Sequence, residues 1–136
     1  MNATDNPFVG KWIYRSLLNE PDINKNFNDL EFGRATLVIE TAMFDELHGT
    51  IGGTDWSLVL RGSCGYGSPM SVRFQGKGFV GGEEWIYDYI GWLVPVWPNS
   101  NSNQQHPAIV GSVVRTIKHG TAPAGIVASF YAVRDN

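Results

Sequence analysis

The sequence predicts an all-β protein, namely an eight-stranded antiparallel up-and-down barrel. Sixteen glycines in 136 residues separate segments rich in Val, Ile, Thr and aromatic residues, and such segments bounded by turn-forming residues are typical of strands. No segment keeps a helical period over the ten or more residues that a helix requires. Eight such segments with mostly short connections form a meander, which closes into a barrel and so leaves no exposed sheet edge.

The expected strands follow one another along the whole chain, which we interpret as a single domain over residues 1–136. They cover residues 9–18, 34–40, 46–52, 55–62, 70–79, 83–94, 108–118 and 125–134. Gly81 and Gly82 form a two-residue hairpin signal between the fifth and sixth strands. Because periodicity does not distinguish a closed barrel from two packed sheets, a β-sandwich is the alternative architecture.

Composition and charge exclude several classes of partner. The net charge is −3 and the ten basic residues are spread singly along the chain, whereas nucleic-acid binding needs clustered cations. The longest nearly uncharged apolar stretch, residues 89–97, is too short to span a membrane. Cys64 is the single cysteine, so no intrachain disulfide forms. The reducing cytoplasm is therefore the expected compartment.

The sequence carries no recognisable metal, cofactor or catalytic motif. None of the three histidines has a second His or Cys at metal-ligand spacing. The glycines of residues 76–81 match a dinucleotide-binding spacing, but no helix pattern follows them, so they fail the context that this motif requires. We therefore expect neither a metal nor a cofactor.

The start of the first expected strand carries a family resemblance. It reads Gly10-Lys11-Trp12, and a Gly-x-Trp at this place resembles the calycin superfamily of barrels, which includes lipocalins, fatty-acid-binding proteins and avidins. The resemblance implies that Trp12 plugs one end of the barrel and that an arginine near the end of the last strand packs across its ring. Arg134 is the candidate. The resemblance also implies a ligand inside the barrel, with its mouth at the opposite end.

A second stretch is similar to avidins in particular. Residues 76–82 form a glycine-turned hairpin, and the strand that follows ends in Trp92-Leu93-Val94. This similarity implies that Trp92 faces the ligand cavity. Residues 13–18 do not reproduce the polar set with which avidins hold biotin, and the final strand lacks the aspartate expected there. Biotin binding is therefore not implied.

The register of the sixth expected strand decides what lies inside the barrel, because successive side chains point to opposite faces. If Trp92 points inward, Asp88 does so too, and Trp85, Tyr87 and Tyr89 form an outer aromatic face. Such a face predicts a homo-oligomer, most simply a dimer. A shift of one residue reverses every side chain. The alternative, in which the aromatics face inward and Asp88 faces water, stays open.

Asp88 is the most informative acidic residue, because a buried carboxylate needs a partner. Arg73 and Arg115 lie on the two strands expected to neighbour it, and a pair inside the barrel would anchor a ligand carboxylate or hydroxyl; an ordinary ion pair is the alternative. Tyr14 shares the inward face of Trp12, and the loop of residues 95–107 is a candidate lid over the mouth. The predicted ligand-binding residues are Tyr14, Arg73, Asp88, Trp92, Trp97, His106 and Arg115.

These observations favour a binding protein of the calycin type for a small hydrophobic molecule held inside the barrel. One alternative is a cofactor-independent cyclase, isomerase or hydratase in which Asp88 serves as general acid or base. Another is a protein-interaction module whose barrel is filled by side chains. The sequence identifies neither the ligand nor a choice between binding and turnover.

Overall fold

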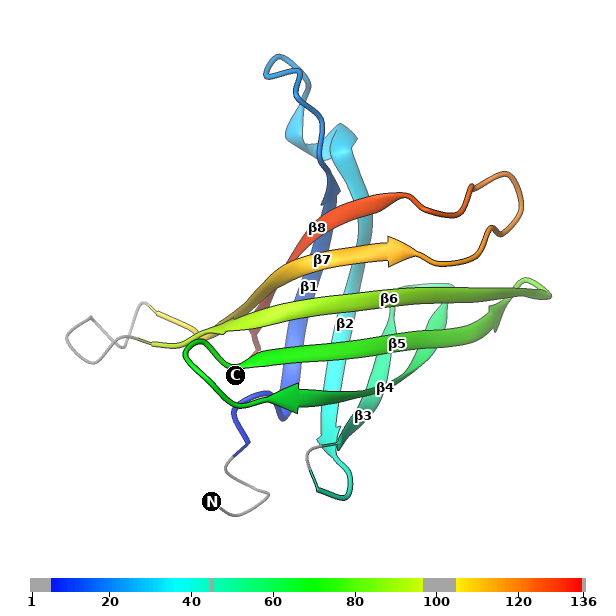
Figure 1. Cartoon of the computed structure of the whole chain (residues 1–136). Coiled ribbons are helices and arrows are strands. Elements are labelled where there is room, and N and C mark those ends of the chain that lie inside the picture. The colour runs from blue at the N-terminus through cyan, green and yellow to red at the C-terminus, as the bar shows by residue number, and fades with distance from the viewer. Residues whose placement is uncertain (1–5, 45, 97–104, 136) are drawn as a thin grey trace.

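The computed structural model describes residues 6–44, 46–96 and 105–135, and their strands form one closed antiparallel barrel (Figure 1). The strands are β1 (Gly10–Leu18), β2 (Glu31–Thr41), β3 (Glu46–Gly52), β4 (Ser57–Gly65), β5 (Ser71–Val80), β6 (Glu83–Val94), β7 (Ala108–Arg115) and β8 (Val127–Arg134). Each strand pairs with the next and β8 pairs with β1, so the predicted up-and-down barrel is confirmed. No helix of the described chain has the length and apolar character needed to cross a bilayer.

The strand boundaries differ from the predicted ones mainly in β2, β4 and β7, and β4 ends three residues later than expected, at Gly65. β2 begins at Glu31, three residues earlier than expected, after a short 3₁₀ helix, η2 (Phe27–Leu30). The Glu31 carboxylate accepts a hydrogen bond from Arg15 Nε at 2.8 Å, and this cross-strand ion pair on the outer face helps extend the ladder. β7 ends at Arg115, three residues earlier than expected, so residues 116–126 form the loop between β7 and β8.

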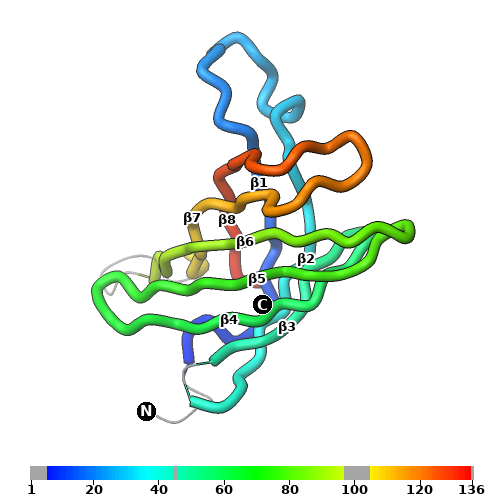
Figure 2. The backbone as a smooth tube through the Cα atoms, turned by 45° about the vertical axis from the view of Figure 1, so that its right-hand side comes forward, coloured from blue at the N-terminus to red at the C-terminus, as the bar shows by residue number. Residues whose placement is uncertain are grey.

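The meander gives the barrel two distinct ends. The connections after β1, β3, β5 and β7 share one end, which we call the open end, and the chain termini and the connections after β2, β4 and β6 lie at the other, the closed end (Figures 1 and 2). Both ends of the segment from β6 to β7 therefore lie at the closed end. The strand direction that would bring residues 95–107 to the ligand mouth is not found, because β6 ends at the closed end. Residues 97–104 of that loop lie outside the described residues.

Trp12 and Arg134 seal the closed end. Trp12 and Phe8 are fully buried, and the Trp12 indole nitrogen donates a hydrogen bond to the Phe8 carbonyl oxygen at 3.0 Å. The Arg134 guanidinium carbon lies 4.5 Å from the centroid of the Trp12 ring, and its Nη2 donates to the Pro7 carbonyl oxygen at 2.7 Å. The expected packing of arginine across tryptophan is thus present.

The middle of the barrel is a packed core. It is made by inward-facing aliphatic and aromatic side chains from all eight strands, and the space left among them has a volume of only about 10 Å³. That volume is at or below what one water molecule needs. The lining residues are Tyr14, Leu37, Ile51, Leu60, Val72, Phe74, Tyr89, Ile109 and Phe130. Any ligand is therefore confined to the end beyond this core.

The inward face of β6 carries the aromatic residues. Tyr87 and Tyr89 are buried, whereas Trp92 is 40% exposed on the other face. Small residues opposite make room for the rings, since a Cβ atom added to Gly76 would lie 3.2 Å from the Tyr89 ring. Asp88 faces outward and accepts hydrogen bonds from Gln75 and Thr116. The register with Trp92 and Asp88 inward is therefore wrong. Phenol and indole rings fill an apolar interior at a lower cost than an unpaired carboxylate.

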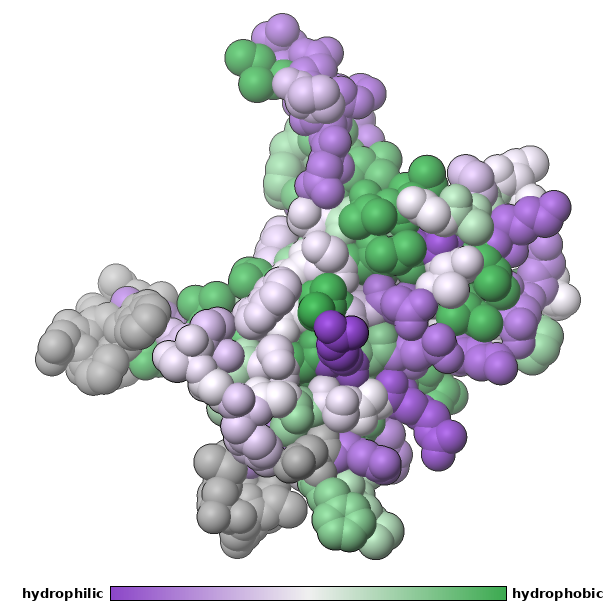
Figure 3. Space-filling model, viewed as in Figure 1, coloured by the Kyte–Doolittle hydropathy of each residue, from purple (hydrophilic) through white to green (hydrophobic). Residues whose placement is uncertain are grey.

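The outer surface is a mixture of polar and apolar residues (Figure 3). Trp92, Val110 and Tyr131, on β6, β7 and β8, occupy neighbouring outward positions and are each between 37% and 40% exposed. Trp85, Tyr87 and Tyr89 do not form an outer face, so that basis for self-association is wrong. Homo-oligomerisation itself stays a prediction.

Candidate ligand site at the open end

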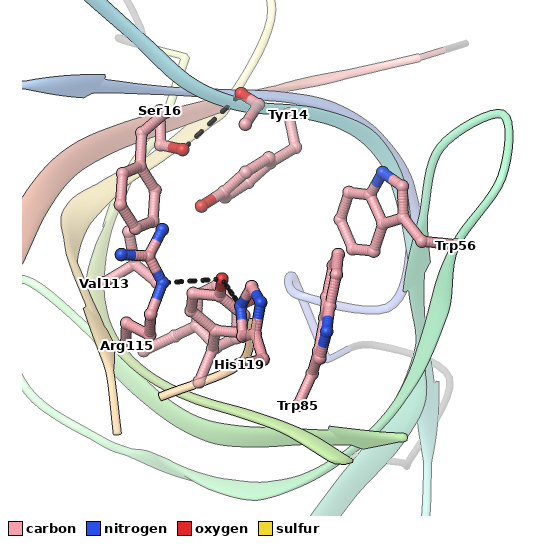
Figure 4. A pocket seen from close by; sticks show the side chains of 11 residues that line it. Tyr14, Ser16, Trp56, Trp85, Val113, Arg115 and His119 are labelled. Carbon is pink, nitrogen blue, oxygen red and sulfur yellow. Dashed lines mark hydrogen bonds between the residues drawn. The ribbon is translucent and has the colours of Figure 1, made fainter. Parts of the chain in front are cut away.

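A cavity of about 210 Å³ lies inside the open end of the barrel (Figure 4). It adjoins the packed core, with which it shares Tyr14 and Tyr89. Its lining is mostly aromatic and carries a few polar groups that converge on one side. The lining residues are Tyr14, Ser16, Phe32, Gly33, Trp56, Trp85, Tyr87, Tyr89, Val113, Arg115 and His119. They come from β1, β2, β6 and β7 and from the loops before β4 and after β7. The site is thus assembled from segments across the whole chain.

Two tryptophans form one wall of the cavity. Trp56 and Trp85 lie with their ring centroids 6.1 Å apart, and Figure 4 shows them across the cavity from Val113 and Arg115. Trp85 occupies an inward position of β6, and Trp56 directly precedes β4. Indole rings provide a flat apolar surface of large area, so this wall suits a planar apolar group.

The base of the cavity is formed by buried phenols. The Tyr14 ring packs at 6.1 Å from Tyr89 and at 5.3 Å from Phe130 between centroids. Burial raises the pKa of both Tyr14 and Tyr89 well above the usual value for tyrosine. Both phenols are therefore protonated at neutral pH and offer hydroxyl groups, rather than negative charges, to their surroundings.

A chain of hydrogen bonds joins the polar groups of the cavity. Arg115 Nε donates to the Tyr87 hydroxyl oxygen at 3.1 Å, and that oxygen lies 2.7 Å from His119 Nε2. The His119 ring stacks on Trp85 with centroids 4.1 Å apart and planes inclined by 19°. Arg115 Nη1 also donates to the Pro123 carbonyl oxygen at 3.2 Å. This chain fixes the position of the β7–β8 loop at the side of the mouth.

The protonation of His119 follows from its surroundings. Burial lowers its pKa below the usual histidine value, the charge of Arg115 lowers it further, and Glu83 opposes both. The imidazole is therefore neutral at neutral pH. Because the Tyr87 oxygen already accepts a hydrogen bond from Arg115, we assign the Tyr87 proton to the hydrogen bond with His119 Nε2, which places the ring proton of His119 on Nδ1.

Of the described residues that line the cavity, Arg115 is the only Lys, Arg, Asp or Glu. Its guanidinium carbon lies 4.9 Å from the centroid of the Phe32 ring. Within the described ranges, no carboxylate lies within the 4.0 Å of an ion pair with Arg115. A half-buried guanidinium without a carboxylate partner gives the cavity a positive charge and favours an anionic group on a ligand.

The structure brings together only part of the predicted ligand-binding set. Tyr14 and Arg115 line the cavity. The other described members lie elsewhere: Arg73, Asp88 and Trp92 are on the outer face of the barrel, and His106 is exposed just before β7 at the closed end. Trp97 lies outside the described residues. Asp88 as an acid or base inside the barrel is thus wrong, because its register directs it to the outer surface.

Sequence reasoning missed Trp56, Trp85, Tyr87 and His119 as members of the site. Two signals were present for them. The aromatic residues alternate along β6, and in the register that turns them inward Asp88 faces water. The direction of the strands also places the loops after odd-numbered strands opposite the Trp12 plug, and His119 lies in one of these loops.

Within the described parts of the chain, no three His, Cys, Asp or Glu side chains come together as a group that could hold a metal ion. No protein-family model, curated protein or solved structure matches the chain. The geometry of the cavity is therefore the basis on which a function can be inferred.

Proposed function

We propose that the protein binds a small, flat, mainly apolar molecule inside the open end of its barrel. The observation that carries this proposal is the cavity of about 210 Å³, which is walled by aromatic rings. It bears one guanidinium, that of Arg115, which has no carboxylate partner among the described residues. A cavity of about 150 Å³ is known to hold benzene, whereas pockets for drug-sized ligands are roughly 300–1,000 Å³. The expected ligand therefore has one ring and a short polar substituent.

The contacts of Arg115 indicate the chemistry of that substituent. Its Nε and Nη1 atoms donate hydrogen bonds within the protein. Among the described residues Nη2 donates no such bond, and it is not a buried atom, so it is available to a ligand. A carboxylate is the matching acceptor for a guanidinium, so we expect an aromatic carboxylate with its ring against Trp56 and Trp85.

The closure by Trp12 and Arg134 supports a barrel of the calycin type, with the ligand held at the end opposite the plug. An interaction module with a completely filled interior fits the described residues less well, because the open end retains a cavity. An enzyme remains the second candidate, and the hydrogen bond between Tyr87 and His119 is the observation that favours it.

Benzoate is the probe that tests the proposed site. Trp85→Ala removes one wall of the cavity, and Trp92→Ala is the matched control because it removes an outward-facing tryptophan from the same strand. In an NMR titration we expect Trp85→Ala to weaken benzoate binding at least tenfold and Trp92→Ala to change it less than twofold. Equal affinities in the two variants, or no benzoate binding by the parent protein, would contradict the proposed site.

Native mass spectrometry of the purified protein addresses the natural ligand. Val113 lines the cavity and is 1% exposed, so Val113→Phe partly fills the space. We expect a small molecule retained by the parent protein to be lost from this variant. A molecule retained equally by both proteins would lie outside the cavity.

A further inference from the structure

We propose that the cavity is also a site of proton transfer, in which Tyr87, assisted by His119, moves a proton between carbon and oxygen of a small aryl 2-oxo acid. The reaction interconverts the keto and enol forms of that acid. This inference rests on the proposed function, because it needs an aromatic carboxylate bound in the same cavity.

The contacts of Tyr87 place its hydroxyl between the two parts of the cavity that bind such a molecule. Its ring lies 6.3 Å from the Trp85 ring between centroids, and its oxygen lies 3.1 Å from Arg115 Nε. A ligand whose ring contacts the tryptophans and whose carboxylate contacts Arg115 must cross the space beside this hydroxyl. The atoms that join ring and carboxylate are therefore the atoms that Tyr87 reaches.

When the aryl 2-oxo acid is a 3-aryl-2-oxopropanoate, those joining atoms are a methylene group and a ketone carbon. The methylene protons are acidic because the adjacent carbonyl accepts the electron pair left by a departing proton. The carboxylate on Arg115 brings the ketone oxygen toward the same positive charge. This substrate class thus places an acidic C–H bond next to Tyr87, which can accept the proton. It also places the oxygen that becomes charged next to Arg115, which can stabilise that charge.

The hydrogen bond from Tyr87 to His119 makes the phenol a competent base. As the Tyr87 oxygen takes a proton from the methylene carbon, its own proton passes to His119 Nε2 over a separation of 2.7 Å. The C–H electron pair forms the carbon–carbon double bond, and the carbonyl pair moves to the oxygen. The proton then returns from Tyr87 and His119 to that oxygen, so the enol is an isomer of the ketone and no co-reactant is consumed.

The charged and titratable groups around His119 set the direction of the pH dependence. Tyr87 and Glu83 face it from β6 and Arg115 faces it from β7, while Lys118 precedes it in its own loop. Only the neutral imidazole accepts the Tyr87 proton. The rate is therefore highest when His119 is neutral and falls as the pH decreases through its pKa, which its surroundings hold below the usual histidine value.

Phenylpyruvate in D₂O is the probe, and NMR measures the rate at which deuterium replaces its methylene protons. We expect the protein to accelerate this exchange above the rate in buffer. Tyr87→Phe retains the ring and removes the hydroxyl, and we expect it to lower the acceleration about 100-fold, in line with the contribution of a positioned acid or base. Tyr131→Phe is the matched control, because Tyr131 lies on the outer face of β8, and it should exchange protons at the parent rate.

His119→Gln tests the positioning role by a readout that a purely structural role would not change. We expect a lower rate that no longer falls at acidic pH, together with phenylpyruvate affinity within about threefold of the parent value. His48→Gln is its control, since His48 lies on an outward position of β3, and it should keep the parent pH profile. Because His119 lies in a loop, this variant also tests the proposal if Tyr87→Phe folds poorly.

The possible results separate the two proposals. If phenylpyruvate binds and no exchange is accelerated, or if both variants exchange at the parent rate, proton transfer is wrong and the binding function stands. If benzoate binds and phenylpyruvate does not, the substrate class is wrong. If neither binds in the cavity, the proposed function fails together with this inference.

Discussion

Each end of the barrel carries an arginine over an aromatic ring, and the two pairs serve different purposes. Arg134 lies 4.5 Å from the Trp12 centroid at the closed end, and Arg115 lies 4.9 Å from the Phe32 centroid at the open end. The chain before β1 covers the first pair, since Phe8 is fully buried and Pro7 accepts a hydrogen bond from Arg134. The second pair borders a cavity.

The difference lies in what surrounds each guanidinium. At the closed end, Gly10, which has a φ of +141°, lets the backbone approach Arg134, and a Cβ atom there would lie 3.1 Å from its Cζ atom. At the open end, the β7–β8 loop is held to the side by hydrogen bonds from Arg115 to Pro123 and from Gly120 to Glu83. An arginine over an aromatic ring therefore closes the barrel at the end where the chain packs over the pair. A similar pair borders a site at the end where the chain is held aside.

The largest expected effect is on the closed end. Trp12→Ala removes a fully buried indole, and the resulting void should lower the free energy of unfolding by about 3–5 kcal/mol. Urea denaturation measures this loss. Trp92→Ala, on the exposed outer face of β6, should cost less than about 1 kcal/mol. Similar losses in the two variants would mean that the Trp12 plug does not contribute more to the free energy of unfolding than an exposed tryptophan does.

An intermediate effect is expected from exchanging each arginine for methionine. Arg134→Met should lower the free energy of unfolding by about 1–2 kcal/mol, through loss of the ring contact and the bond to Pro7, and should leave benzoate affinity unchanged. Arg115→Met should change stability by less than about 1 kcal/mol and weaken benzoate binding at least tenfold, because a hydrogen bond to a charged group contributes about 1.5–3 kcal/mol. The opposite assignment of losses would overturn the division of roles.

The smallest expected effect concerns the phenols between the two ends. Tyr14 and Tyr89 have raised pKa values in the folded protein, so the unfolded chain loses these protons first as the pH exceeds about 10. Their contribution to stability is complete below that pH and decreases above it, by less than about 1 kcal/mol per phenol at pH 10.5.

Urea midpoints between pH 8 and 10.5 measure this decrease, which should be smaller in Tyr14→Phe. Tyr131→Phe removes an exposed phenol and should leave the slope unchanged. A slope that Tyr14→Phe does not alter would indicate that the base of the cavity is more open to water than its packing suggests.

The sequence by itself determined the strands, their order and the closed end. Alternation and glycine-rich turns are local properties, so they located all eight strands to within a few residues. The pairing of Trp12 with Arg134 was implied by the resemblance of the Gly-x-Trp segment to calycin barrels, and the structure contains it. Strand direction also follows from the meander, which predicts that β6 ends and β7 begins at the closed end.

Only the tertiary structure decided the interior. Both faces of β6 carry large apolar residues, so its own pattern did not determine which face turned inward; neighbouring strands did so by placing Gly76 beside Tyr89. Tyr87 and His119 are 32 residues apart and meet because β6 pairs with β7 with Tyr87 opposite Arg115, which brings the loop after β7 beside β6. A site made of such contacts depends on how the strands pair in the closed sheet, whereas each strand is determined by the residues within it.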